Sequence, residues 1–208
     1  MRVYRQEELE QRTDEWLSLK WGRMSASRID RLTKSAKLDY IRGRAMEARR
    51  YPPLMEDQYL ARAAQRGVES EPFALAAFLA KTGLPESTIS CIEIGNHFIL
   101  SPDYLSEDMT MGAEIKILEP DEMGKAVYVG KILAKHYWQV VSYFMVPQLE
   151  VMSYVLYSPA IDNANGKDYI RIIELRRIDC LSDIARIEIL ISEAGQMIDI
   201  LRLSDSND

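Results

Sequence analysis

The stretch SPDYLSEDMTMGAEIKIL, residues 101–118, decides the fold prediction. Near its end, apolar and charged side chains alternate, and alternate side chains of a β-strand lie on the same face. The apolar set is Ala113, Ile115 and Ile117. We therefore expect these three side chains in the core and Glu114 and Lys116 together on the opposite face. A short hairpin would bring the carboxylate of Asp103, at the end of the preceding strand, beside Glu114.

Two neighbouring carboxylates such as Asp103 and Glu114 repel each other unless a cation neutralises them. Mg²⁺ is a hard, oxygen-binding ion that suits such a pair, and it can polarise a phosphoryl oxygen and lower the pKa of a bound water. Lys116 would add an ammonium that positions this water or stabilises charge in the transition state. Because acid–x–Lys triplets are common, an ordinary hairpin with a surface Glu/Lys pair is the alternative interpretation of this segment.

Working outward from this segment, the pattern of apolar residues predicts the other elements. Helical patterns cover 6–20, 26–36, 55–67, 71–83, 124–147 and 181–202. Strand patterns cover 89–95, 97–101, 111–118, 149–158 and 167–176. A loop is expected at 38–54 and a turn at 162–166. Pro72 fits the first turn of the helix predicted over 71–83, and it would kink a helix that continued through from 55–67. Without repeats or linkers, this order predicts a single α/β (α+β) domain, residues 1–208, with a central mixed β-sheet flanked by helices.

The net charge of −6 hides an uneven distribution. Residues 20–50 contain ten Lys and Arg against three acidic residues, a net charge of +7, which leaves −13 for the rest of the chain. A basic segment on an acidic body suits a protein that grips a polyanion in one groove. On charge alone, a solvated helix face is the simpler interpretation.

Several classes of protein are disfavoured by composition. No apolar run approaches the roughly 20 residues that span a bilayer, and the N-terminal MRVYRQEELEQ lacks the apolar region of a signal peptide, so an intracellular location is expected. Cys91 and Cys180 are too few for a Cys₄ zinc site or a four-cysteine iron–sulfur cluster. His97 and His136 lie in no metal-ligand spacing, and the absence of glycine-rich phosphate loops argues against a nucleotide-driven motor.

Five ordered motifs extend the interpretation. They are WLSLKWGRMSAS (16–27), RGVESEPFA (66–74), SPD (101–103), EIK (114–116) and WQVVSYF (138–144). In this order the chain resembles the lambda exonuclease-like (YqaJ-type viral recombinase) family of the PD-(D/E)xK nuclease superfamily. The resemblance covers about two-thirds of the chain and implies a restriction-endonuclease-like core.

The resemblance also implies a metal site. Asp103 and Glu114 resemble the carboxylate ligands, the main-chain carbonyl of Ile115 a further ligand, and Lys116 the catalytic lysine. Glu71 matches the acidic residue that completes the site, either on the same ion or through a second one. Glu69, two residues away, is not expected to contribute. The implied ion is Mg²⁺, with Mn²⁺ as a substitute.

Further positions match the family in the same way. Gln139 corresponds to the glutamine that orients the lysine or the attacking water, and Ser27 to the serine that binds a DNA 5′-phosphate. Lys20 stands where arginine is common, which keeps the charge but loses the bidentate fork. Tyr104 replaces a glycine that is common after Ser-Pro-Asp, which raises a question about the turn geometry.

The implied activity is that of a 5′→3′ exonuclease that degrades double-stranded DNA from its ends and leaves 3′ single-stranded overhangs, as in phage-type recombination. The implied location is the cytoplasm of a bacterial or phage-infected cell. The expected assembly is a homotrimer, and a single-strand annealing protein is an expected partner. Three alternatives stay open: a structure-specific or restriction-type endonuclease, a catalytically silent DNA-end-binding protein, and an acidic scaffold protein. A role at a membrane is not expected.

Overall fold

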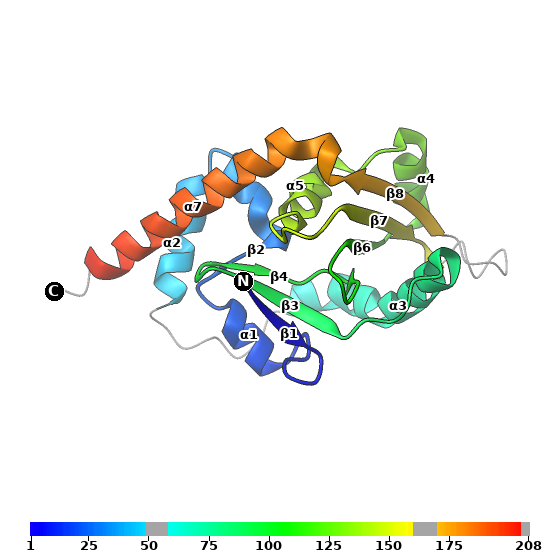
Figure 1. Ribbon diagram of the computed structural model, residues 1–208, viewed down its shortest axis with the longest axis horizontal. Helices are drawn as coiled ribbons and strands as arrows, with labels where there is room; N and C mark the ends of the chain where they lie inside the picture. The colour runs from blue at the N-terminus through cyan, green and yellow to red at the C-terminus, as the bar shows by residue number, and fades with distance from the viewer. Residues whose placement is uncertain (49–57, 160–169, 205–208) are drawn as a thin grey trace.

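A computed structural model describes residues 1–48, 58–159 and 170–204, and the side chains of 58–68 are left out of the description. Its strands form two four-stranded sheets (Figure 1). Sheet A has the order β1 (Arg2–Arg5), β3 (Ile89–Ile94), β4 (Phe98–Leu100) and β2 (Met24–Ser25). Sheet B has the order β5 (Tyr104–Leu105), β6 (Met111–Ile117), β7 (Val151–Tyr157) and β8 (Ile170–Arg176). In each sheet one neighbouring pair is parallel, β2 with β4 and β6 with β7, and the others are antiparallel.

Helical segments surround both sheets. They are α1 (Asp14–Lys20), the 3₁₀ segment η1 (Ala26–Thr33), α2 (Lys37–Glu47), α3 (Gln58–Thr82), α4 (Pro120–Val129), α5 (Ala134–Tyr143), the 3₁₀ segment η2 (Arg177–Cys180) and α7 (Leu181–Ser204). Figure 1 shows α7 running beside α2, and α3 lying along the side of sheet B that is away from α7. None of the described helices has the length and apolar character needed to cross a membrane.

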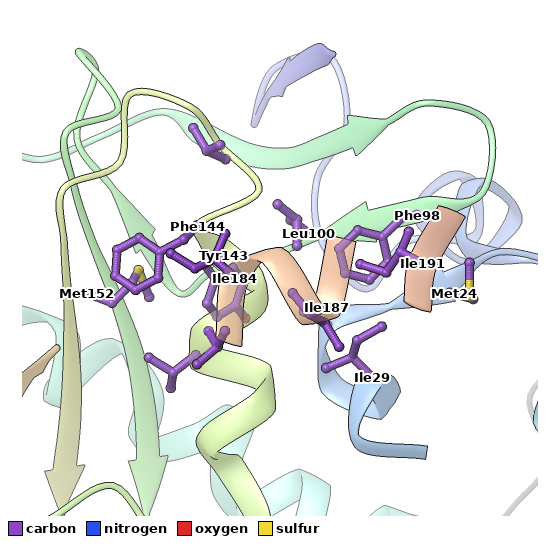
Figure 2. Packing of buried hydrophobic residues seen from close by; sticks show 14 of the residues in the cluster. Met24, Ile29, Phe98, Leu100, Tyr143, Phe144, Met152, Ile184, Ile187 and Ile191 are labelled. Atoms are coloured by element: carbon purple, nitrogen blue, oxygen red, sulfur yellow. The ribbon is translucent and has the colours of Figure 1, made fainter. Parts of the chain in front are cut away.

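The two faces of sheet B pack against different helices. Ala113 and Ile115 of β6 contact a cluster that contains Phe78 of α3. The opposite face joins the main core, in which Tyr143 and Phe144 at the end of α5 meet Met152 and residues of α7 (Figure 2). The predicted alternation along β6 is therefore confirmed, but the face that carries Glu114 is covered by α5 instead of being open to solvent.

Helix α7 contributes a regular apolar stripe to the main core. Its buried members are Ile184, Ile187, Ile191, Ala194 and Ile198. This three- and four-residue spacing places one side of the helix toward the core, as expected for an amphipathic helix. Figure 2 shows Ile187 and Ile191 opposite Phe98 and Ile29, so α7 ties sheet A to η1.

The mixed α/β fold class predicted from the sequence is confirmed, with two mixed sheets in place of one. Four local predictions are wrong, three of which concern the segments 6–20, 38–54 and 124–147. The helix predicted over 6–20 is limited to α1, because residues 2–5 pair with β3 and a turn follows. The loop predicted at 38–54 contains α2, whose buried Tyr40, Ile41 and Ala45 supply an apolar side. The helix predicted over 124–147 is two helices, because Gly130 ends α4 with a left-handed backbone (φ +62°).

A fourth local prediction is also wrong. The two helices predicted over 55–67 and 71–83 are one continuous helix, Gln58–Thr82, with Pro72 inside it. Other predicted segments agree with the structure or lie outside the described residues. The strands predicted around 89–101, 111–118 and 149–158 are present. The turn predicted at 162–166 and parts of the segments predicted at 38–54 and 55–67 lie outside the described residues.

Candidate active site

The Ser-Pro-Asp segment connects the two sheets. It leaves β4 of sheet A and enters β5 of sheet B within three residues. The backbone N–H of Asp103 donates to the carbonyl of Ala113 (3.1 Å), and the backbone N–H of Ile115 donates to Oδ2 of Asp103 (2.5 Å). The carboxylate of Asp103 is thus held at the edge of β6 beyond the short strand β5. Because both backbone groups of a strand residue point to the same edge, the carbonyl of Ile115 also faces this side.

The turn geometry does not require the glycine that Tyr104 replaces. Among the described residues, only Arg12 and Met109 are non-glycine residues with positive φ. Tyr104 is buried, its ring packs edge-on against Phe78 of α3, and its hydroxyl donates to the carbonyl of Pro85 (3.0 Å). The substitution therefore anchors the start of the hairpin to α3.

Glu114 is almost completely buried, with an exposed fraction of 3%. Its Oε1 accepts hydrogen bonds from Nζ of Lys116 (2.6 Å) and Nε2 of Gln139 (2.7 Å). Its Oε2 accepts a hydrogen bond from the hydroxyl of Tyr143 (2.5 Å), and Gln139 also donates to that hydroxyl (3.2 Å). Gln139 and Tyr143 lie one turn apart on α5, so this helix fixes both oxygens of the carboxylate.

The charges of this group influence one another. Burial, followed by the charges of Glu114 and Glu71, raises the pKa of the Asp103 carboxyl well above its usual value. Burial lowers the pKa of Lys116, but the carboxylates of Glu114 and Asp103 outweigh it, so the pKa of Lys116 is raised overall and its ammonium stays charged. Burial and the charge of Glu114 raise the pKa of Tyr143, which keeps its phenol a hydrogen-bond donor.

Glu71 lies on α3, directly before Pro72. Its Oε2 accepts a hydrogen bond from Nη2 of Arg12 at 2.5 Å. The charge of Glu71 raises the pKa of Asp103, so the structure brings this third carboxylate toward the other two. Its side chain is turned to Arg12.

The donors present fit a hard cation in their chemistry. Three carboxylates and a main-chain carbonyl are the oxygen ligands that Mg²⁺ prefers, and the mutual repulsion recorded at Asp103 is the charge excess that a cation would offset. Within the described ranges, no group of three or more His, Cys, Asp or Glu is gathered closely enough to hold a metal as it stands. The oxygens of Glu71, Asp103 and Glu114 instead accept hydrogen bonds from protein donors.

A second group of predicted residues lies on α1 and η1. The ammonium of Lys20 sits 3.8 Å from the ring centre of Trp16, and burial lowers the pKa of Lys20 to about 8. Ser27 is exposed in the first turn of η1, with its hydroxyl 3.2 Å from that of Ser25. Ser25 occupies the N-cap position of η1, but its side chain makes no capping hydrogen bond.

One open pocket of about 190 Å³ brings both groups together. Six of the eight predicted site residues line it: Lys20, Ser27, Asp103, Glu114, Lys116 and Gln139. Glu71 reaches the same pocket through Arg12, which is one of its lining residues. We call the side formed by Asp103, Glu114, Lys116 and Gln139 the acidic wall, and the side formed by Lys20 and Ser27 the basic wall.

Sequence reasoning assigned no site role to several residues that line this pocket, among them Tyr143, Gln11, Arg12 and Trp16. Tyr143 lies in the motif WQVVSYF, which indicates that this helix belongs to the site but does not predict the hydrogen bond from Tyr143 to Glu114. Gln11, Arg12 and Trp16 precede or begin the first motif, and no spacing in the sequence indicated that they face the carboxylates. The two histidines lie elsewhere: the ring of His97 bonds to Asp199 and that of His136 to Tyr154.

Solved structures of two exonucleases share this fold. An alkaline exonuclease (LHK-Exo) from Laribacter hongkongensis has a TM-score of 0.72 at 22% identity, covering 94% of this chain and 99% of its own. The same exonuclease in complex with dAMP has a TM-score of 0.73 at 21% identity, with equal coverage. A phage-related exonuclease from Haemophilus somnus 129PT has a TM-score of 0.57 at 14% identity, covering 89% of this chain and 97% of its own.

These likenesses confirm the predicted fold. The chain matches no protein-family model and no curated protein sequence. At these identities the shared property is the fold.

Proposed function

We propose that this protein is a Mg²⁺-dependent exonuclease that hydrolyses double-stranded DNA from its 5′ ends. The observation that carries the proposal is the single pocket that joins the acidic wall to the basic wall. A nuclease needs carboxylates for a metal beside a cation that can act on the attacked phosphate, and an end-directed nuclease also needs a site for the terminal phosphate. The two similar structures are both described as exonucleases, which agrees with this assignment.

In this proposal Asp103, Glu114, Glu71 and the carbonyl of Ile115 hold Mg²⁺, or Mn²⁺ in its place. The ion would supply Lewis-acid polarisation of the phosphate and a water of lowered pKa. Lys116, whose ammonium stays charged beside Glu114, would position the attacking water or stabilise the charge that develops on the phosphate oxygens. Gln139 orients Glu114 through Oε1, the same oxygen that binds Lys116.

The basic wall would set the polarity of attack. Ser27 lies in the first turn of η1, where backbone N–H groups lack helical partners and favour an anion. Its hydroxyl and the ammonium of Lys20 can donate to the same terminal 5′-phosphate. Anchoring that phosphate beside the acidic wall leads to removal of nucleotides in the 5′→3′ direction, which leaves 3′ single-stranded overhangs suited to phage-type recombination and to a single-strand annealing partner.

We also propose that the protein assembles as a homotrimer. A closed ring gives an acidic protein a way to hold a polyanion, by placing basic residues on its inner surface. Light scattering at micromolar concentration is expected to give three times the 23.9 kDa mass of the chain. A monomer under these conditions would contradict the trimer and the expectation of processive digestion.

The decisive experiment compares linear duplex DNA with a covalently closed circle of the same sequence. We expect digestion of the linear DNA in Mg²⁺, no attack on the circle, and no digestion in EDTA. Cleavage of the circle would identify an endonuclease instead. Binding of linear ends without any cleavage would identify a DNA-end-binding protein with a silent site.

A further inference from the structure

Arg12 has an unusual backbone conformation. Its φ of +73° lies in the left-handed region that L side chains rarely adopt, and such residues concentrate at functional sites. Both neighbours hold it in place. The side chain of Gln11 donates to the carbonyls of Ser90 (2.7 Å) and Pro102 (3.4 Å), and Thr13 caps α1 by accepting from the N–H of Trp16 (3.3 Å). The segment is thus fastened to the backbone directly before Asp103.

Arg12 lines the pocket that contains both walls. One of its N–H groups donates to Oε2 of Glu71, and among the described residues no other partner of this guanidinium is recorded. Its side chain is 45% exposed, so its other donors are accessible from solvent. A planar fork of N–H donors matches the oxygens of a phosphate as well as those of a carboxylate.

Glu71 therefore has two candidate cations. In the proposed function it completes the metal site, whereas here its carboxylate is bound to Arg12. Because one carboxylate oxygen cannot serve both cations fully, metal binding and the Arg12–Glu71 ion pair compete. Release of this pair would leave the guanidinium within a pocket shared with Lys20, Ser27 and Lys116.

We propose that Arg12 is a DNA-phosphate ligand that stays paired with Glu71 until metal binds. This inference rests on the proposed function. Metal on Glu71 frees the guanidinium for a phosphate of the bound strand, and the bound phosphate in turn keeps Arg12 away from Glu71. Metal and DNA then favour each other's binding, as reciprocal coupling requires.

The test uses the full-length chain with Arg12→Gly, Arg12→Lys and, as a matched control, Arg171→Ala, an exposed arginine on β8 that does not line the pocket. Arg12→Gly removes the guanidinium and is compatible with positive φ, so it is expected to fold. Binding of Mn²⁺ without DNA is followed by electron paramagnetic resonance. Binding of 5′-phosphorylated duplex in Mg²⁺ is followed by fluorescence anisotropy, with every variant placed in a Lys116→Ala background so that the DNA is not consumed.

The two measurements are expected to move in opposite directions. Arg12→Gly should bind Mn²⁺ up to about fivefold more tightly, because a competing cation is lost, and should bind duplex about tenfold more weakly. The slope of log affinity against log salt should fall by about one, the loss of one phosphate contact. Arg12→Lys should keep the salt slope with intermediate DNA affinity, and Arg171→Ala should match the parent.

Weaker binding of both Mn²⁺ and DNA by Arg12→Gly would make Arg12 a structural residue and overturn the inference. Unchanged binding of both would overturn it as well. The proposed function is tested separately by the wild-type protein: if it cleaves linear duplex in Mg²⁺ while Arg12→Gly binds DNA normally, only the role of Arg12 fails. If the wild type neither cleaves DNA nor binds Mn²⁺, the proposed function itself fails.

Discussion

The two walls of the pocket are built in opposite ways. On the acidic wall, Glu114 is buried and both of its oxygens accept hydrogen bonds from side chains of β6 and α5. On the basic wall, Ser27 is exposed, and the ammonium of Lys20 rests on the ring of Trp16. Within the described part of the chain, this ammonium forms no salt bridge with a carboxylate. The acidic wall is fixed by the protein, whereas the basic wall is open toward a ligand.

This difference separates two tasks. A buried carboxylate is costly unless donors satisfy it, so a group held this rigidly suits chemistry that depends on fixed geometry. A cation without a carboxylate partner suits recognition, because the ligand supplies the missing anion. Substitutions on the acidic wall should therefore affect turnover most, and substitutions on the basic wall should affect the choice of DNA end.

The largest effect is expected for Asp103→Ala. Loss of a proposed metal ligand should abolish cleavage of linear duplex at saturating Mg²⁺, as EDTA does to the wild type. Because the change also relieves repulsion from Glu114 and Glu71, the metal-free variant should be at least as stable as the wild type. Gel assays and thermal melts measure the two results, with Asp121→Ala on α4 as the control. Robust cleavage by Asp103→Ala would place the chemistry elsewhere.

Lys116→Ala should follow in size. It removes a transition-state contact, so kcat should fall about 10²- to 10⁴-fold while binding of DNA ends is largely kept. Lys135→Ala, which removes an exposed lysine of α5 paired with Glu122, should leave kcat unchanged. An equal loss of binding and turnover would identify Lys116 as a phosphate-binding residue of the acidic wall and not as a catalytic one.

Tyr143→Phe should have an intermediate effect. The packing of the ring in the main core is preserved (Figure 2), but Oε2 of Glu114 loses its donor. Removing the partner of a metal ligand lowers metal affinity or activity by about 10- to 100-fold. We expect a higher Mg²⁺ concentration for half-maximal activity, with a smaller change in kcat at saturating Mg²⁺.

Tyr154→Phe is the matched control for this prediction. Tyr154 is as buried as Tyr143, and it lies on β7 directly beside Glu114. Its hydroxyl bonds to His136 and not to a carboxylate. An equal shift in the Mg²⁺ requirement of both variants would indicate a general effect of core packing, and the bond between Tyr143 and Glu114 would lose its proposed role.

The sequence predicts features that short-range patterns carry. The alternation around Glu114 places Lys116 on the same face, and the structure gives the contact between them. It does not predict contacts between distant segments. Arg12 and Glu71 are 59 positions apart, and Tyr143 and Glu114 are 29 apart, so neither pair leaves a periodic signal.

The same limit explains the errors in the fold. Strand β1 has four residues, and its pairing with β3 comes from a segment more than 80 positions away. Helix α2 is polar over most of its surface, and its few buried residues become informative only once α7 and η1 lie against it. One sheet was expected because the strands follow one another, yet the three-residue Ser-Pro-Asp segment divides them into two.

The smallest effect concerns the preference for 5′-phosphorylated ends. If Ser27 and Lys20 bind the terminal phosphate, wild type should digest 5′-phosphorylated duplex faster than 5′-hydroxyl duplex, and Ser27→Ala should reduce this ratio without unfolding the protein. Ser27→Ala is not expected to remove a helix cap, because Ser25 holds the N-cap position. Equal rates on both substrates, for wild type and variant alike, would reopen the direction of attack.

The pH dependence of this preference sharpens the role of Lys20. Burial lowers the pKa of Lys20 to about 8, with Arg28 and Arg44 lowering it further and Cys91 and Glu114 opposing the shift. The ammonium is therefore charged below about pH 8 and loses its proton above it, so the ratio of rates on 5′-phosphorylated and 5′-hydroxyl duplex should fall as the pH rises from 7 to 9. The ratio cancels any pH effect on the chemical step that both substrates share. Lys20→Arg keeps its charge throughout this range, so its ratio should stay constant. A ratio that falls equally in Lys20→Arg would assign the titration to another group and would contradict the role of Lys20 in binding the terminal phosphate.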